Sequence, residues 1–302
     1  MATIHGTIQP SPTNRFPSKL RDYYTLTKPE VNLHILMTTS AGYYLASRGP
    51  FKIAGLMNTL VGTLLIAGGT ATLNQWMERV WDGQMRRTAS RPLPSGRLKA
   101  REALLFGMLL SIAGGLYLAV AVNALAALLA ISTLLSYLLI YTPLKRKTPL
   151  CTLLGAFPGA MPALIGWAGA SASIERHAWF LFVVLFLWQF PHFYSIAWMY
   201  KEDYARAGIQ MLPVVEPDCR STARQIVLYG IALIPVSLVP GMLGMTGRIY
   251  LIGALILGLV YLYSGVRVAL DRTLVRARAV LLTSVLYLPL IYGLMLLDRP
   301  GL

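Results

Sequence analysis

Residues 53–97 read IAGLMNTLVGTLLIAGGTATLNQWMERVWDGQMRRTASRPLPSGR. The block 53–75 is apolar and long enough for a membrane helix, because a bilayer core about 30 Å thick needs roughly 20 apolar residues. Polar and basic residues follow it without a break. This order predicts a transmembrane helix whose inner end carries a concentrated set of ionisable groups, which are costly near hydrocarbon and usually face a cavity.

Three oxygen-bearing side chains recur at the inner end of this helix. Asn74, Glu78 and Asp82 lie four residues apart, so on an α-helix they drift by only about 40° per step and rise by about 6 Å. We call these three residues the oxygen ladder. Such a ladder can hold Mg²⁺ and leave coordination positions open for water and a diphosphate.

Basic residues extend the same face. Arg86 continues the stripe one turn after Asp82, and Arg87 and Arg91 lie close by. A guanidinium binds phosphate oxygens through two parallel hydrogen bonds, which favours a diphosphate site. The alternative is a solvated helix beside the membrane, whose acids pair with arginines one turn away.

Composition indicates a polytopic membrane protein. The 302 residues are 56% hydrophobic and 13% charged, with a mean hydropathy of +0.58, outside the usual range of soluble domains. We expect an all-α fold with nine transmembrane helices, near residues 31–47, 53–75, 102–121, 123–142, 150–171, 178–200, 225–243, 248–267 and 279–297.

The net charge of +15 reflects membrane topology. With the N-terminus inside, 22 of the 27 basic residues fall in inner segments. The positive-inside rule therefore predicts an N-in, C-out orientation, and the charge does not indicate a nucleic-acid partner.

Residues 1–30 hold four prolines and no apolar core, and we expect them to form a cytoplasmic N-terminal segment before a single transmembrane domain at 31–302. Cys151 and Cys219 form no metal-ligand pattern.

Two further inner segments carry polar groups. In YTPLKRKTP, residues 141–149, Lys145 and Arg146 are ordinary inner-side charge if taken alone, and become diphosphate candidates only beside the ladder. Tyr141 can face the same cavity.

The other segment spans residues 188–213. There, Pro191 is expected to kink or break the sixth span. His192 and Asp203 would share a face if the helix continues, so that Asp203 completes a metal site, and Lys201 adds a cation. For His192 and His34, hydrogen-bonded packing is the alternative to a chemical role. His5 and His177 are expected to be peripheral, and the glycines of the fifth span to allow close helix approach.

The first loop resembles the N-x-x-x-D-x-x-x-D signature of the UbiA superfamily of intramembrane prenyltransferases, with Glu78 in place of the middle aspartate. Within that superfamily, the runs at 82–96, 141–148 and 191–213 are similar to the protoheme IX farnesyltransferase (haem O synthase) family. The runs L26-T-K-P29 and 155–162 extend the resemblance over most of the chain.

The resemblance implies nine helices around a central cavity open to the cytoplasmic face of a bacterial inner membrane. It implies that farnesyl diphosphate, haem b and water give haem O and diphosphate. It also suggests roles: catalysis and Mg²⁺ binding by Asn74, Glu78, Asp82 and Asp203; diphosphate binding by Arg86, Arg87, Arg91, Lys145, Arg146 and Lys201; and haem binding by His192, His34 and Tyr141. One departure is that the second aspartate-rich motif of superfamily relatives is absent.

Two other functions remain open at this stage. A sister prenyltransferase would act on a quinone precursor or a chlorin, and the missing second motif argues against it. A transporter would more naturally place its acids near the bilayer midplane. The sequence leaves open the oligomeric state and an association with haem A synthase.

Overall fold

The protein is described here from a computed structural model that covers residues 18–299. Within this range the chain is helical and contains no β-strand. The long helices are α2 (Pro29–Ala46), α3 (Ile53–Asp82), α4 (Ala100–Ala121), a run of α5 (Ala124–Leu135), η1 (Ser136–Tyr141) and α6 (Thr142–Leu144), then α7 (Cys151–Ser171), α8 (Arg176–Met199), α11 (Arg220–Met242), α12 (Arg248–Leu270) and α13 (Leu274–Leu297).

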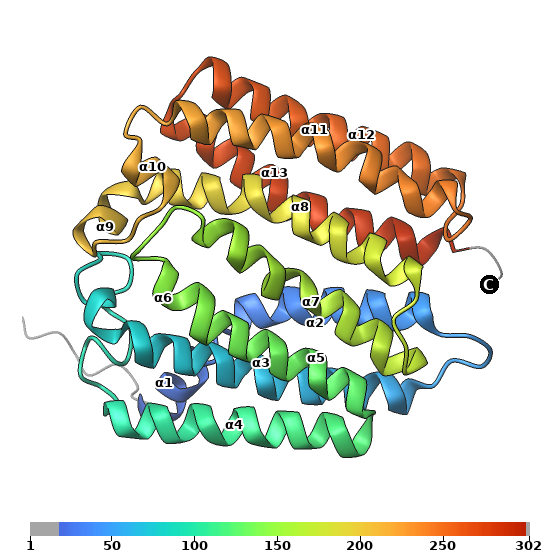
Figure 1. Cartoon of the computed structure of the whole chain (residues 1–302), viewed down its shortest axis with the longest axis horizontal. Helices are drawn as coiled ribbons and strands as arrows, with labels where there is room; N and C mark the ends of the chain where they lie inside the picture. Colours follow the sequence, from blue (N-terminus) through green and yellow to red (C-terminus); the bar gives the residue numbers. More distant parts are fainter. Residues whose placement is uncertain (1–17, 300–302) are drawn as a thin grey trace, which may run out of the picture.

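The helices run side by side and share two ends (Figure 1). The short helices α1 (Ser18–Leu26), α9 (Lys201–Arg206) and α10 (Leu212–Val215) gather at one end, together with α6 and the loop after α3. The last turns of α13 lie at the opposite end. The polar segments singled out in the sequence are therefore brought to one end of the bundle.

Eight helices in the described range are long and apolar enough to cross a membrane. The multi-pass membrane fold is thereby confirmed. Each of the nine predicted spans overlaps one long helix, but α2 has only 18 residues and carries Glu30, Asn32 and His34 in its first two turns. The ninth span and the orientation stay predictions.

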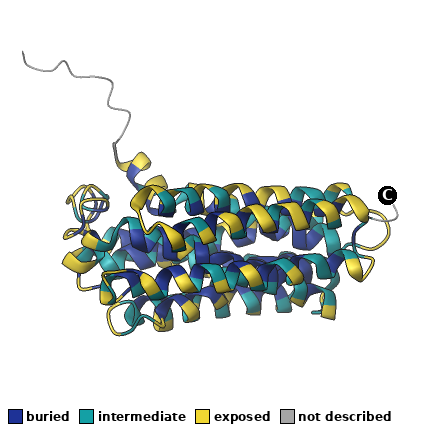
Figure 2. Cartoon of the chain, turned by 90° about the horizontal axis from the view of Figure 1, so that it is seen from above, coloured by how far each residue is buried: buried dark blue, intermediate teal, exposed yellow. Residues whose placement is uncertain are grey.

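The core lies around α7 and α8. In these two spans 72% and 61% of the apolar window is buried, against at most 39% in the other spans. Exposed residues line the outside of the bundle in Figure 2, as expected for helices whose apolar faces meet lipid.

Glycines set the closest helix contacts of α7. A Cβ atom at Gly166 would collide with the backbone oxygen of Thr39 in α2, and one at Gly155 would lie 2.6 Å from the Tyr141 ring. Small residues let helix backbones approach each other in this way. The predicted close approach of the fifth span is confirmed.

Two backbone features differ from the sequence-based expectation. Helix α8 continues through Pro191, so the expected break is absent, and transmembrane helices tolerate proline where neighbouring helices support the segment. Helix α8 then ends at Met199, and Asp203 belongs to α9. His192 and Asp203 therefore do not share one helical face.

Candidate active site

The oxygen ladder occupies the last turns of α3. This helix reaches Asp82 because no proline or glycine interrupts residues 70–82, whereas Gly83, Pro92, Pro94 and Gly96 follow. Asn74 is 0% exposed and Asp82 only 1%. Buried polar groups at this depth require partners, and each ladder residue has a cationic one.

Asn74 contacts Lys28 and Thr142. The Lys28 ammonium donates to Asn74 Oδ1 at 3.0 Å, and Asn74 Nδ2 donates to the Thr142 hydroxyl at 3.1 Å. Lys28 adopts a left-handed backbone conformation with φ of 51°, which is uncommon for residues other than glycine. Burial, with a smaller contribution from Arg91, lowers the pKa of Lys28 to about 7.

Glu78 pairs with Lys145. The Lys145 ammonium lies 2.8 Å from Glu78 Oε1, and both side chains are about seven-eighths buried, at 13% and 12% exposure. Burial opposes the charge of Lys145, but the Glu78 carboxylate outweighs it and raises the pKa of Lys145 well above its ordinary value. The ammonium also lies 4.5 Å from the centre of the Tyr141 ring, within cation–π range.

A π-helical turn positions the aromatic neighbours of Lys145. Pro143 has no N–H for the helix, and directly before it the backbone widens into η1, where the Thr142 N–H bonds the Tyr137 carbonyl. The Thr142 hydroxyl donates to the same carbonyl at 2.9 Å. Thr142 thus links the π-helical turn to Asn74.

Asp82 pairs with Arg91. Arg91 Nη1 donates to Asp82 Oδ2 at 2.7 Å, and the Thr88 hydroxyl donates to the Asp82 carbonyl at 2.8 Å. These bonds fold the basic loop back onto the end of α3. Asp82 Oδ1 is buried, and no residue between 18 and 299 forms a hydrogen bond with it.

The ladder is therefore compensated by three cations from three separate segments: Lys28, Lys145 and Arg91. None of these pairs has the spacing of one helical turn, and the ladder is buried. The alternative of a solvated helix with acids and arginines one turn apart does not describe this structure.

The ladder fits a divalent cation. Its donors are the carboxylate and amide oxygens that Mg²⁺ prefers, and the unpartnered Asp82 Oδ1 is a buried acceptor that lacks a donor. Asp203 is not gathered with these residues: within residues 18–299 no three His, Cys, Asp or Glu side chains cluster as they would for a metal ion. Instead, Asp203 accepts from the Arg87 backbone N–H at 3.2 Å and pairs with Arg206.

The remaining predicted phosphate ligands point elsewhere. Arg87 lies over the Tyr200 ring and donates to the Tyr204 hydroxyl at 3.2 Å. Arg146 lies 4.5 Å from the Trp81 ring centre, and Lys201 donates to the Pro217 carbonyl at 3.1 Å. In the described part of the chain, no hydrogen bond or ion pair joins these three residues to the ladder.

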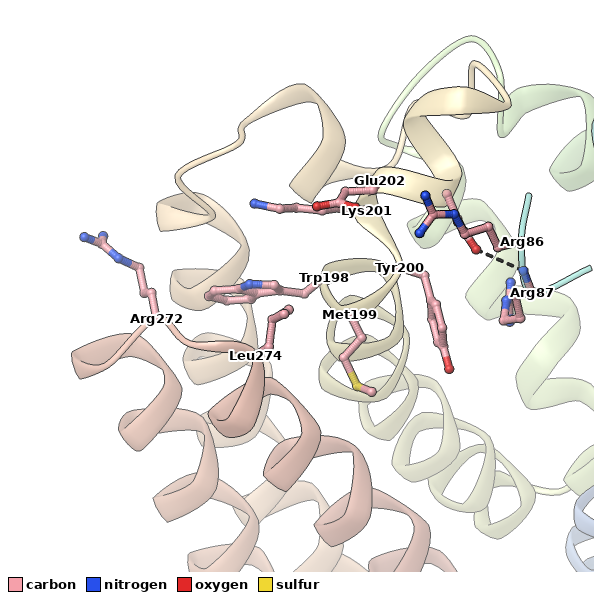
Figure 3. Close-up of a pocket in the computed structure, with 10 residues that line it drawn as sticks. Arg86, Arg87, Trp198, Met199, Tyr200, Lys201, Glu202, Arg272 and Leu274 are labelled. Carbon is pink, nitrogen blue, oxygen red and sulfur yellow. Dashed lines mark hydrogen bonds between the residues drawn. The ribbon is translucent and has the colours of Figure 1, made fainter. Parts of the chain in front are cut away.

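A cavity of about 660 Å³ opens at this end of the bundle, beside Asp203 (Figure 3). It is lined by Arg86, Arg87, Trp198, Met199, Tyr200, Lys201, Glu202, Asp203, Arg272 and Leu274. Its volume is in the range of small-molecule sites.

The two intramembrane histidines have different partners. His192 stacks on Trp188 with ring centres 4.8 Å apart, and its Nδ1 is 2.8 Å from the Ser284 hydroxyl. His34 Nδ1 lies 2.9 Å from the Glu30 carbonyl. Among residues 18–299, no hydrogen bond is made by Nε2 of either ring. His5 lies outside the described residues.

Sequence analysis did not identify Lys28, Thr142 or Tyr137 as site residues. The L-T-K-P run, in which Lys28 precedes Pro29, is the one sequence feature that could have pointed to Lys28. Nothing in the sequence marks Thr142 as the partner of Asn74, because that contact joins residues 68 positions apart.

Comparison with known proteins places the chain in a family. The model of the UbiA prenyltransferase family matches residues 35–289. Protoheme IX farnesyltransferase of Solibacter usitatus is 65% identical over 94% of this chain and all of its own length. The protein of the same name from Koribacter versatilis is 46% identical over 93% of this chain and 94% of its own.

Solved structures share the fold. Digeranylgeranylglyceryl phosphate synthase in membranes superposes with a TM-score of 0.77 at 18% identity, covering 93% of this chain and 98% of that one. A UbiA homologue from Archaeoglobus fulgidus, bound to DMAPP and Mg²⁺, superposes with a TM-score of 0.67 at 15% identity, covering 91% and 99%. At these identities the likeness establishes the fold.

Proposed function

The chain belongs to the UbiA prenyltransferase family and, within it, to the protoheme IX farnesyltransferases, and we propose that it transfers the farnesyl group of farnesyl diphosphate to a vinyl group of haem b. Water adds in the same reaction, and the products are haem O and diphosphate. The observation that carries this proposal is the buried oxygen ladder with its three cations.

The ladder is the proposed Mg²⁺ site. Asn74, Glu78 and Asp82 would hold the ion, with Asp82 Oδ1 as a ready acceptor. When bound, Mg²⁺ supplies Lewis-acid stabilisation of the departing diphosphate. Asp203, placed on α9, is proposed as an outer contributor rather than a member of the ladder.

The cations of the ladder are the proposed diphosphate ligands. Lys28, Lys145 and Arg91 each hold a ladder oxygen. With Mg²⁺ held by those oxygens, these three side chains would be free to donate to phosphate oxygens. Donors fixed in a water-poor site stabilise charge that develops on a leaving group, so they favour breaking the C–O bond, whose electron pair leaves with diphosphate. The same role for Arg86, Arg87, Arg146 and Lys201 stays a prediction.

Loss of diphosphate leaves an allylic farnesyl cation, which reacts with the haem acceptor inside the bundle. The apolar walls of the bundle exclude water and limit premature hydrolysis. The vinyl π electrons of haem form the new C–C bond, and a water molecule adds to the resulting cation and loses a proton. His192 Nε2, or that of His34, would contact the haem or orient this water, with Tyr141 beside Lys145.

We further propose nine spans with an N-in, C-out orientation, a cytoplasmic segment at 1–30 and one transmembrane domain at 31–302. The active end, rich in basic residues, would face the cytoplasm of a bacterial inner membrane.

An acceptor competition tests the proposed function. Membranes containing the protein receive Mg²⁺, farnesyl diphosphate labelled at C1, and equal amounts of haem b and a quinone precursor. The label is expected in the haem fraction. Label in the quinone fraction with unlabelled haem would favour the sister prenyltransferase.

A further inference from the structure

The cavity beside Asp203 has a strongly cationic wall. Arg86, Arg87, Lys201 and Arg272 line it, and the acids among its lining residues are Glu202 and Asp203. Asp203 is already paired with Arg206. Among residues 18–299, Arg86 and Arg272 have no ion-pair partner, so this wall holds positive charge that the protein itself does not compensate.

The same cavity has an apolar side. Trp198, Met199 and Leu274 line it next to the cations, and Figure 3 draws Trp198 between Lys201 and Leu274. Leu274 also begins the 24-residue helix α13, whose N-terminus favours negative charge. A ligand that matches both sides is amphipathic, flat or apolar in its body and anionic at one edge.

Helix α8 connects this cavity to the histidine region. Met199 follows His192 by seven residues, so the two lie on nearly the same helical stripe, about 10 Å apart along the axis. This separation is comparable with that between the centre of a porphyrin and its propionate carboxylates.

We propose that this cavity binds the propionate carboxylates of the haem acceptor, with Arg272 as their principal ligand. The inference rests on the proposed function and assigns a site to its acceptor. It separates two anion sites at one end of the bundle: Lys28, Lys145 and Arg91 at the ladder for diphosphate, and Arg272 in the cavity for carboxylates.

The test compares haem b with its dimethyl ester, which lacks both negative charges. Protein in nanodiscs of zwitterionic lipid is assayed with each acceptor, and haem binding is also titrated by absorbance. For the wild type, KM should be about tenfold higher for the ester, since one charged hydrogen bond is worth about that factor.

The variant Arg272→Ala should raise KM and Kd for haem b about tenfold, with little change in either constant for the ester or for farnesyl diphosphate.

Arg278→Ala is the matched control, because Arg278 is an exposed arginine of α13 that lies six residues after Arg272 but does not line the cavity. Equal effects of Arg272→Ala on haem b and on the ester would overturn the inference. So would an effect that appears only when anionic lipid is added, which would identify a lipid headgroup site. Failure of the wild type to prenylate either acceptor would instead contradict the proposed function.

Discussion

At the scale of single residues, Asp82 is the most constrained member of the site. One carboxylate oxygen bonds Arg91, and the other is buried without a donor. An unpaired buried acceptor is unfavourable, and it is retained here where a metal ion would complete it.

We predict that Asp82→Asn lowers turnover by roughly a hundredfold or more at saturating Mg²⁺, the size of loss seen when one stabilising group is removed from an active site. Product formation per milligram of inserted protein measures this. Glu175→Gln is the control. Glu175 lies in the connection between α7 and α8, away from the ladder, and pairs with the exposed Arg48. Wild-type turnover in Asp82→Asn would refute the assigned role.

The Glu78–Lys145 pair predicts a strong coupling in stability. Lys145→Met leaves the Glu78 carboxylate buried and unpaired, which should lower the free energy of unfolding by about 3 kcal/mol. Glu78→Gln combined with Lys145→Met should recover most of that loss, since no buried charge remains. Thermal unfolding midpoints in detergent measure both variants, and additive losses would contradict a coupled pair.

At the scale of helices, close packing of α2 against α7 holds His34 and Lys28 in position. We predict that Gly166→Ala lowers stability by about 1–3 kcal/mol, because the new methyl group meets the backbone of α2. Gly293→Ala in α13 is the matched control, since no atom lies within 4 Å of a Cβ there. Equal melting temperatures for the two variants would contradict the role of Gly166 in this contact.

The sequence predicted the positions of the long helices well, because apolar block length and loop charge are local properties. It predicted the ladder on one helix for the same reason. It did not predict η1, since a π-helical turn depends on how Pro143 and Thr142 share backbone partners. Nor did it predict which cation meets which ladder oxygen, because these contacts join distant segments. Lys145 and Glu78, for example, are 67 positions apart in the sequence.

The same limit applies to Asp203. A continuous helix would have placed it below His192, but α8 ends at Met199 and the chain turns into α9. The carboxylate then bonds the Arg87 backbone and Arg206, so it helps to fix the loop after α3 against the end of α8. Only the tertiary structure distinguishes this arrangement from a second metal site.

At the scale of the whole molecule, the fold separates two tasks. The bundle presents apolar helices to lipid, where a prenyl chain and a porphyrin both partition. One end collects the ladder, its three cations and the basic cavity. Charge stabilisation and acceptor binding are thus adjacent yet built from different residues, so variants of one set should leave the substrate affinity of the other largely unchanged.

The most direct test of the proposed reaction is the mass of haem extracted after incubation of the membrane-embedded protein with haem b, farnesyl diphosphate and Mg²⁺. The account predicts a gain equal to one farnesyl group plus one water, heavier still in heavy-oxygen water, and no gain after chelation of Mg²⁺. Unchanged haem mass with intact farnesyl diphosphate would contradict it, as would a gain without the oxygen of water.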